Sequence, residues 1–564
     1  MFSILDLGED IICSNIAVLL SPRDVFLLSL TCHKLRKFLT TNEVYHLLYI
    51  KKFGSKPTPL RIESYNWHDV FHLRSSPGAN LFTWGSASMG RLGYSLSDIP
   101  SQNITTNGFQ KNVHTPTNVS NFNTQFIDDI SAGGFSIQIL TDDGSLYFTG
   151  SNWKRSEISN LTPGPHECKD YSPMDSDTAG MSSYSTHSIP GVIGLPLFRR
   201  RLQNQVSLPQ VSEPTRHQSG ERHTNPNLRY PPEQQYPNSI NVEAGLNSSP
   251  ESNFVTRLKM PQDSAFPNRK IVSVSSGREH IIALDNYQNV LTWDSGSQSY
   301  VGINLRFSGI KYHHISKITA GWNLLACYIN HIGIIYWCSR APINKETYET
   351  GAMLSDAAYR IIPGTGSIDI DDIHAGCDFI LFIKKGKLYR VDINVSSIAA
   401  GSVDEIGIDR AYPVRGFNNW LEDYDKEGSR IKFTKISGCY LNFAVFTNDG
   451  MVLLGNKDIS MEDAVDNPII LPGLQKNNII DVQMGDYHSL ALTDNGSVLA
   501  WGVESNNCGC LGLGTKEEFT ERYHLTNDEV VLSHPFPIKK PNEDGKWLAI
   551  TSAGWHSCGI FVAP

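Results

Sequence analysis

The sequence predicts a mainly β fold in which short hairpins repeat along the chain and close into a ring. Two segments of alternating apolar and polar residues, "HSLALT" and "SVLAW", flank Asp494-Asn495-Gly496, a pattern typical of two strands joined by a tight turn. One hairpin cannot bury its apolar face alone, so we expect packed copies. Each copy begins at a glycine, here called the anchor glycine: Gly133, Gly277, Gly321, Gly376, Gly438, Gly485 and Gly554.

Ring closure is predicted by counting strands. Seven segments carry an anchor glycine, but the last of them contains one strand only, near residues 556–561. One further strand, at residues 81–84, precedes the first segment and has no anchor glycine. Pairing these two strands would remove two open sheet edges. The sequence therefore predicts a seven-bladed β-propeller over residues 81–564, preceded by a small α-helical domain.

Two motifs allow the repeat to be compared with a known family. The segments "WGVESNNCGCLGLGT" (501–515) and "WGSASMGRLGYS" (84–95) resemble the W-G-x-N-x-x-G-x-L-G-x-G signature of the regulator of chromosome condensation family. The resemblance implies a seven-bladed propeller. The middle repeats depart from the signature, since Asp294 follows Trp293 where the family has glycine, and Arg390 stands where tryptophan is usual. The boundaries of the middle blades therefore stay open.

A second apolar pattern precedes the ring, in "LDLGEDIICSNIAVLLSPRDVFLLSLTCHKLRKFL" (5–39). Val25, Leu28, Cys32, Leu35 and Leu39 repeat at three- or four-residue spacing, which predicts one apolar helix face. Other apolar residues fall largely off that face, namely Leu20, Phe26, Leu27 and Leu30. So short a segment cannot cover two apolar faces, and one of them is expected to dock on a partner. The alternative is a helical cap of the propeller with no partner.

This segment resembles an F-box, with Gly8 in place of the usual proline. The resemblance implies a domain at residues 1–54, comprising the F-box and a following helix, and a linker at residues 55–80. It also implies that the domain binds the adaptor of a ubiquitin ligase. The adaptor-binding residues carried over are Leu5, Leu7, Ile11, Ile12, Ile16, Leu19, Leu20, Pro22, Asp24, Val25, Leu28, Cys32 and Leu35.

Composition changes between residues 151 and 268. This stretch holds 14 of the 29 prolines together with many Ser, Asn and Gln residues, and it is predicted to be a disordered insertion in a loop of the propeller. Inside it, "IPGVIGLPLFRRRL" (189–202) is an apolar and basic cluster. That cluster is either disordered linker or a docking motif.

The sequence predicts no cluster of catalytic or metal-binding residues. His280, His488 and His556 recur at corresponding positions shortly after their anchor glycines, which indicates a structural role. The loop at 423–434 starts like a calcium site but has Thr434 where a bidentate Glu is needed. Cys508 and Cys510 are too close for usual zinc or redox pairing. The recurrent tryptophans, Trp84, Trp293, Trp337 and Trp501, are expected to pack in the core. We therefore expect no catalytic residue, metal or cofactor.

Charge and hydropathy limit the partners. The net charge of −9 gives no overall attraction to nucleic acid or to an anionic membrane. The first apolar run, "IICSNIAVLL", is interrupted by Ser14 and Asn15 and is preceded by no basic residue, so neither a signal peptide nor a membrane span is expected. A cytoplasmic or nuclear location follows as the expectation.

Two functions are compatible with this organisation. The F-box resemblance implies a non-catalytic substrate receptor of an SCF (cullin–RING) ubiquitin ligase, with the adaptor and cullin as partners and a protein target on the propeller. The resemblance to F-box proteins with one such propeller implies that this target is a metabolic enzyme, of purine salvage for instance, which is degraded at growth arrest. The alternative is a guanine-nucleotide exchange factor or scaffold propeller for a small GTPase. The F-box favours the ligase, and no substrate-contact residue can be assigned.

Overall fold

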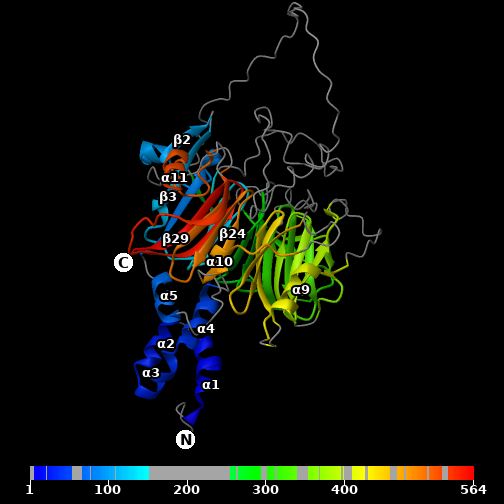
Figure 1. The fold of residues 1–564 in the computed structure, drawn as a ribbon. Helices are drawn as coiled ribbons and strands as arrows, with labels where there is room; N and C mark the ends of the chain where they lie inside the picture. The colour runs from blue at the N-terminus through cyan, green and yellow to red at the C-terminus, as the bar shows by residue number, and fades with distance from the viewer. Residues whose placement is uncertain are drawn as a thin grey trace, which may run out of the picture. The chain divides into compact units, whose positions relative to one another are not determined.

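A computed structural model describes residues 6–20, 22–53, 66–75, 78–107, 110–150, 254–261, 265–293, 301–311, 314–338, 354–366, 369–395, 398, 410–425, 428, 430–457, 467–475, 478–504, 507–523 and 531–563. Within these residues the strands form seven sheets, which confirms the predicted mainly β fold. The sheets follow one another along the chain and are here called blades 1 to 7 (Figure 1).

Blade 1 contains strands from both ends of the repeat region. Its order is β2 (Ile104–Asn107), β3 (Gln110–Asn118), β1 (Ala79–Ser86), β29 (His556–Val562) and β28 (Lys546–Ala553). β1 pairs antiparallel with β29, and Leu81 lies opposite Ile560. The red strand β29 accordingly lies beside the blue and cyan N-terminal strands in Figure 1. The pairing gives both strands a neighbour on each side, so that neither edge stays open.

The other six blades are each built from consecutive strands, apart from one exchange. Blade 2 contains β4 (Ile127–Ala132), β5 (Ile137–Thr141), β6 (Leu146–Thr149) and β7 (Val255–Leu258), and blade 3 contains β8 (Ile271–Ser276), β9 (Ile281–Asp285), β10 (Val290–Trp293), β11 (Ile303–Arg306) and β15 (Leu354–Asp356). Blade 4 contains β12 (Ile315–Ala320), β13 (Leu324–Ile329), β14 (Gly333–Cys338) and β16 (Tyr359–Ile361), and blade 5 contains β17 (Ile370–Ala375), β18 (Phe379–Lys384), β19 (Lys387–Asp392) and β20 (Tyr412–Pro413). Blade 6 contains β21 (Phe433–Cys439), β22 (Asn442–Thr447) and β23 (Val452–Asn456), and blade 7 contains β24 (Ile479–Met484), β25 (His488–Thr493), β26 (Val498–Val503) and β27 (Val531–Pro537). The exchange is β15, which runs parallel to β11 at the edge of blade 3.

The first strands of the blades line the centre of the ring and are here called the inner strands. β4, β8, β12, β17, β21, β24 and β28 contact one another in that order, and β28 contacts β4 again. The apolar core lies largely between neighbouring blades. Trp84 of blade 1 is fully buried in one cluster with Trp501 and Leu511 of blade 7, and its indole N–H donates to the carbonyl of Cys510 (3.0 Å). Trp293 and Trp337 are also buried, which confirms the packing role expected of the recurrent tryptophans.

The anchor position is defined by the turn that follows each inner strand. In five blades the predicted glycine occupies it, and its N–H donates to the carbonyl three residues later: Gly133, Gly277, Gly321, Gly376 and Gly485. In blades 6 and 1 the same position holds Cys439 and Ala553, which pair with Asn442 and His556. The predicted anchors Gly438 and Gly554 are therefore wrong by one residue, in opposite directions. A glycine adjoins the true position in both segments, and strand pairing decides the register only in three dimensions.

Short helices precede the ring and pack around a core of their own, which includes Val25, Leu35 and Trp67. They are α1 (Glu9–Ile11), a π-helical turn η2 (Ile12–Ile16), a 3₁₀ turn η3 (Ala17–Leu19), α2 (Pro22–Ser29), α3 (His33–Leu39), α4 (Asn42–Phe53) and α5 (Trp67–Arg74). Helical segments outside this group are η5 (Ser88–Gly90), η6 (Leu96–Asp98), η7 (Ser101–Asn103), η8 (Ser120–Phe122), α9 (Arg415–Tyr424), α10 (Pro472–Gln475) and α11 (Lys516–Tyr523). No helix of the described residues is both long and apolar enough to cross a membrane.

Two expectations about this region need correction. The apolar spacing from Val25 to Leu39 predicts one helix face, but the chain forms α2 and α3 with a break between them. The Thr31 hydroxyl donates to the carbonyl of Leu28 (2.7 Å), and the Cys32 thiol accepts the N–H of Leu35 at the start of α3, so local polar contacts replace helical ones. The expected linker at 55–80 contains α5, which Asn66 caps through the N–H of Asp69, and its last residues begin β1.

The predicted insertion at 151–268 ends earlier than composition indicated. Residues 151–253, with the 189–202 cluster, lie outside the described residues. Residues 255–258 form β7, which pairs with β6 and completes blade 2. The strand is short and lies among Pro and Asn residues, which conceal it in a composition scan.

We expect that a short Gly-Ser linker can replace residues 151–253 without loss of the propeller. Thr149 and Val255 face each other in the β6–β7 ladder, so a few residues can join the two strands. Closing the shorter loop costs about 2 kcal/mol less conformational entropy. The thermal midpoint should stay equal or rise, as measured by circular dichroism. Loss of the cooperative transition would mean that the replaced residues are part of the ring.

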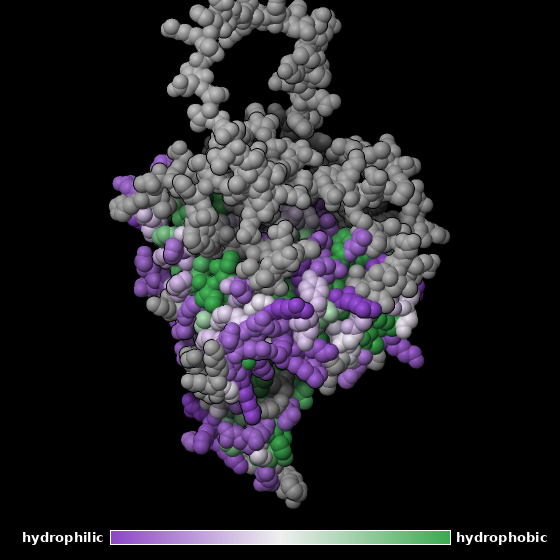
Figure 2. All heavy atoms as spheres, turned by 45° about the vertical axis from the view of Figure 1, so that its right-hand side comes forward, coloured by the Kyte–Doolittle hydropathy of each residue, from purple (hydrophilic) through white to green (hydrophobic). Residues whose placement is uncertain are grey.

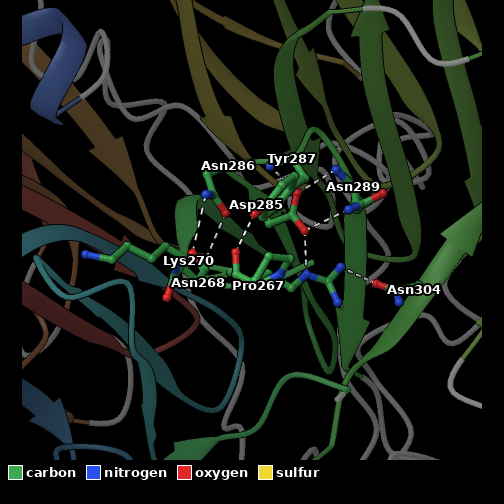
Figure 3. Close-up of polar contacts among 9 residues, drawn as sticks. Pro267, Asn268, Lys270, Asp285, Asn286, Tyr287, Asn289 and Asn304 are labelled. Carbon is green, nitrogen blue, oxygen red and sulfur yellow. Dashed lines mark hydrogen bonds and ion pairs between the residues drawn. The ribbon is translucent and has the colours of Figure 1, made fainter. Parts of the chain in front are cut away.

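A polar network around Asp285 joins the turn between β9 and β10 to the segment that leads into β8 (Figure 3). The Asp285 carboxylate is buried, forms an ion pair with Arg269 and accepts the N–H groups of Tyr287 (2.9 Å) and Asn289 (2.7 Å). Asn286 accepts the N–H of Lys270 (2.8 Å). In this turn the positive φ falls on Gln288 (68°), where blades 2, 6 and 7 have Gly144, Gly450 and Gly496. The Asp285 carboxylate therefore stabilises a turn that lacks glycine at its positive-φ position.

Candidate interaction surfaces

The structure divides the predicted adaptor-binding residues by their exposure. Ile12, Val25 and Leu35 are buried in the helical core, whereas Ile11, Leu19 and Asp24 are exposed; Leu7, Ile16, Leu20, Leu28 and Cys32 are partly buried. Leu5 and the Pro22 side chain lie outside the described residues. Direct docking through Ile12, Val25 and Leu35 would require the core to open, so these three residues stabilise the helices and do not form the docking surface themselves. Their apolar spacing indicates the face of the helices that packs in the core.

The apolar surface of this region is formed largely by other residues. Among the described residues, twelve large hydrophobic side chains are exposed, and six of them belong to the N-terminal helices. Four are here called the docking surface: Leu19 (80% exposed), Phe26 (53%), Leu27 (49%) and Leu30 (60%). Small hydrophobic patches are visible among hydrophilic residues over these helices, at the lower end of the space-filling view (Figure 2). Leaving such side chains in water forgoes about 1.5–3 kcal/mol each, and an exposed apolar patch of this kind is typical of interaction surfaces.

Phe26, Leu27 and Leu30 were not in the predicted set. Their signal was present in the sequence, since they fall off the face defined by Val25 and Leu35. What decides between the two faces is which one the following helices cover. Trp67 and Phe71 of α5 complete the core on the Val25 side, and both lie far along the chain.

The centre of the ring encloses a polar cavity of about 120 Å³, lined by inner strands of all seven blades. Near the starts of these strands, charged residues of adjacent blades pair: Lys435 Nζ is 2.7 Å from Asp481 Oδ1, and Lys317 forms an ion pair with Asp372. Arg74 of α5 lines the same end. It is 2% exposed and donates to the Tyr49 hydroxyl (2.7 Å) and to the carbonyl of Asp128 (2.6 Å).

Midway along the cavity, hydroxyl groups join neighbouring blades. The Thr551 hydroxyl accepts the N–H of Ala132 (2.9 Å), and the Ser275 hydroxyl accepts the N–H of Ala320 (3.0 Å). These contacts satisfy backbone donors that no strand ladder reaches. The interior polar groups therefore hold blades together.

The other end of the cavity, here called the mouth, is built by the seven turns that follow the inner strands. Backbone N–H groups in these turns donate to carbonyls of the next blade, as Trp322 N–H does to Gly376 (3.3 Å) and Cys377 N–H to Tyr440 (3.0 Å). Side chains at the first two turn positions therefore surround the mouth. They include Phe135, Arg278, Trp322, Tyr440, Asp486, Tyr487 and Trp555, all partly exposed.

The three recurrent histidines support the turns from inside. His280, His488 and His556 occupy the same place, directly across the turn from the anchor position. A Cβ at Gly485 would lie 2.2 Å from the ring of His488, so the glycine leaves room for that ring. Burial lowers the pKa of His488 to about 3, and His488 Nε2 lies 2.7 Å from Ser557 Oγ in blade 1. The ring therefore stays neutral and packs between blades.

Glu504, Cys508 and Cys510 come together in a buried loop of blade 7, where their ligand atoms lie within 4.8 Å of one another. The spacing of the two cysteines in the sequence argues against a usual zinc or redox pair, and in the structure the carboxylate of Glu504 lies beside them. The Glu504 oxygens accept the N–H groups of Gly509, Cys510 (3.2 Å) and Leu511 (3.3 Å). This hydrogen bonding makes Glu504 the cap of a loop whose Cys510 carbonyl binds Trp84.

A pH dependence follows from this loop. Burial raises the pKa of Glu504 from 4.5 to about 7, and the backbone N–H donors oppose the rise. Between these two values the folded chain binds more protons than the unfolded chain, so the free energy of unfolding falls as pH rises. Glu504→Gln should lose less stability between pH 5 and pH 8 than the wild type in urea unfolding. Exposed Glu543→Gln is the control, and equal slopes in all three would contradict the prediction.

Comparison with known proteins agrees with this architecture. Two models of the Regulator of chromosome condensation (RCC1) repeat match residues 479–510 and 495–560. The chain is 27% identical over 582 residues to SCF-associated factor 1 of Saccharomyces cerevisiae, covering 88% of this chain and 84% of the relative. It is 22% identical over 308 residues to F-box protein pof9 of Schizosaccharomyces pombe, covering 52% and 58%.

Among solved structures, the chain is similar to Prp20p of Saccharomyces cerevisiae, with 12% identity, a TM-score of 0.48, and coverage of 88% of this chain and 94% of Prp20p. The chain thus forms a seven-bladed propeller preceded by a small helical domain, its residues 479–560 match the regulator of chromosome condensation repeat, and it resembles SCF-associated factor 1 over most of its length.

Proposed function

We propose that this chain is the substrate-recognition subunit of an SCF ubiquitin ligase. The docking surface on the N-terminal helices binds the F-box-binding adaptor, through which the chain joins the cullin. The observation that carries this proposal is the gathering of exposed apolar side chains on those helices, among them Leu19 and Phe26. The printed names of the two relatives, an SCF-associated factor and an F-box protein, support it.

In this role the chain performs no bond chemistry. The propeller holds the protein target, so that a target lysine stays near the conjugating enzyme at a high effective concentration. Ubiquitination then marks the target for degradation by the proteasome. A metabolic enzyme degraded at growth arrest, of purine salvage for instance, is the target class that the resemblance implies. The exchange-factor alternative uses the propeller but gives no role to the docking surface.

The test is co-purification of the adaptor and cullin with a tagged chain carrying Phe26→Lys and Leu30→Lys. Both side chains are more than half exposed, so the substitutions should not affect folding. A central hot spot contributes about 2 kcal/mol or more to an interface, and adaptor binding should therefore fall at least about 30-fold. Binding of a protein target to the propeller should persist, while its ubiquitination should be lost.

The matched control is Val272→Lys with Tyr424→Lys, at exposed apolar positions of the propeller (50% and 44%). This variant should bind the adaptor as the wild type does. Substitution of Val25 is unsuitable, because a charge at that buried position would disrupt the helical core. Undiminished adaptor and cullin recovery with the Phe26 and Leu30 variant, measured by quantitative mass spectrometry, would refute the proposal.

A further inference from the structure

Aromatic residues are concentrated in the turns around the mouth. Phe135, Trp322, Tyr440, Tyr487 and Trp555 all lie in the two-residue turns and stay partly exposed. Turns of this kind favour Gly, Asn and Asp for conformational reasons, so large aromatic side chains there have another cause. Partly exposed aromatic and arginine residues in a concave setting are typical of binding hot spots.

Planar side chains from five blades contact one another in series around the mouth. The guanidinium groups of Arg91 and Arg278 lie 5.3 Å and 5.5 Å from the centroid of the Phe135 ring. Arg278 also lies 4.5 Å from the ring of Trp322, and Trp322 is 4.7 Å from Tyr440. The two arginines nevertheless differ in what their hydrogen-bond donors reach.

Arg91 uses its hydrogen-bond donors within the fold. It is 4% exposed and donates to the carbonyls of Ser88 (3.0 Å) and Gly134 (3.4 Å). The side chain of Arg278 is 32% exposed, and within the described part of the chain its guanidinium makes no hydrogen bond. Phe135 and Trp322 both lie against the guanidinium, and part of the side chain stays exposed to solvent. An arginine held in this way loses little conformational freedom when it binds a carboxylate through its donor fork.

Two carboxylates of the chain lie near this guanidinium. Glu279 is 39% exposed and 3.8 Å from Arg278 Nε, an exposed ion pair of small energy, so an external carboxylate can compete with Glu279 for the Arg278 guanidinium. Asp486 lies across the mouth in blade 7, where burial raises its pKa to about 6 against the opposing effect of Arg278 and Arg91. The turns around the mouth therefore hold the partly exposed Arg278 guanidinium together with the carboxylates of Glu279, Asp486 and Asp378, the last of which forms an ion pair with Lys457.

We propose that the mouth binds an acidic segment of a protein, with Arg278 as the carboxylate receptor and Trp322 and Tyr440 as the surface on which the segment lies. The proposal rests on the proposed function only in identifying that protein as the ubiquitination target. The opposite end of the cavity is lined by Arg74 and the paired Lys and Asp residues, whose charges already have partners in the fold.

The experiment measures binding of fluorescein-labelled Gly-Ser peptides to the full-length chain by fluorescence anisotropy. One peptide carries three central Glu residues, and matched peptides carry three Gln, three Lys or one phosphoserine. The Glu peptide should bind at least about tenfold more tightly than the Gln peptide, since a charge-assisted hydrogen bond is worth that much. Binding of the phosphoserine peptide without binding of the Glu peptide would overturn the assignment of Arg278 as a carboxylate receptor.

Arg278→Met keeps the length of the side chain and removes its charge, and it should weaken Glu-peptide binding about tenfold. Arg306→Met is the control, because Arg306 is a half-exposed arginine of the same blade with its own partner, Asp356. Glu279→Gln alters an exposed residue and should strengthen binding, which provides a second test should Arg278→Met fold poorly. Tryptophan fluorescence should change on binding, and Trp322→Phe should reduce that change, while Trp555 remains.

Equal binding of the Glu and Gln peptides, preference for the Lys peptide, or an unchanged affinity in folded Arg278→Met would overturn the proposal. None of these peptide measurements requires the adaptor. Failure of the chain to co-purify with the adaptor would therefore contradict the proposed function without contradicting this binding site. Failure of peptide binding would contradict the binding site without contradicting the proposed function.

Discussion

Deletion of residues 556–564 is expected to abolish cooperative folding of the whole propeller. It removes β29, which lies between β1 and β28 in blade 1, so both neighbouring strands lose a ladder of hydrogen bonds. All seven residues of β29 are buried. Losing Cys558, Ile560, Phe561 and Val562 alone forgoes about 6–12 kcal/mol of burial, which is comparable to the total stability of a domain. Circular dichroism during thermal unfolding measures the effect.

The linker variant that lacks residues 151–253 is the control for this deletion. It removes a far longer stretch but none of the described strands, and it should retain the transition. The contrast separates ring closure from chain length. A transition in the truncated chain at the wild-type temperature would show that the ring does not depend on pairing between its ends.

Substitution of Gly321 by alanine is expected to cost about 3 kcal/mol or more of unfolding free energy. A Cβ at this anchor position would lie 1.9 Å from the carbonyl oxygen of Gly376 and 2.7 Å from that of Ala375. Both atoms belong to the backbone of the next blade and cannot turn aside as a side chain can. The two inner strands must therefore separate, and the contact between Trp322 N–H and Gly376 is lost.

Gly8→Ala is the matched control, because a Cβ there meets no atom within 4 Å and its φ of −64° suits alanine. Gly554→Val tests a second cause of strain, since Gly554 has a φ of 51° and a Cβ would lie 2.7 Å from the carbonyl oxygen of Gly134. Urea unfolding midpoints measure all three. If Gly321→Ala unfolds at the same urea concentration as Gly8→Ala, the blades are not packed as tightly as the structure shows.

Several features of the interaction surfaces required the tertiary structure. The sequence shows two apolar faces on the N-terminal helices but not which of them is buried, because α5 covers the Val25 side from outside the predicted domain. Arg278 appears in the sequence as one charged residue in a turn. Its role as a candidate receptor depends on Phe135 and Trp322, which come from the neighbouring blades and meet it only when blades 2, 3 and 4 pack side by side.

The sequence by itself determined the repeating hairpins, their number and the pairing of their two ends, because strand alternation and turn residues are local and an open sheet edge is unfavourable. It also determined that the recurrent tryptophans are buried. Tertiary structure decided the exact register, in which Cys439 and Ala553 take the anchor position in place of Gly438 and Gly554. A glycine next to a turn satisfies the same local pattern from either side, and only hydrogen bonding to the paired strand fixes which residue stands at the turn.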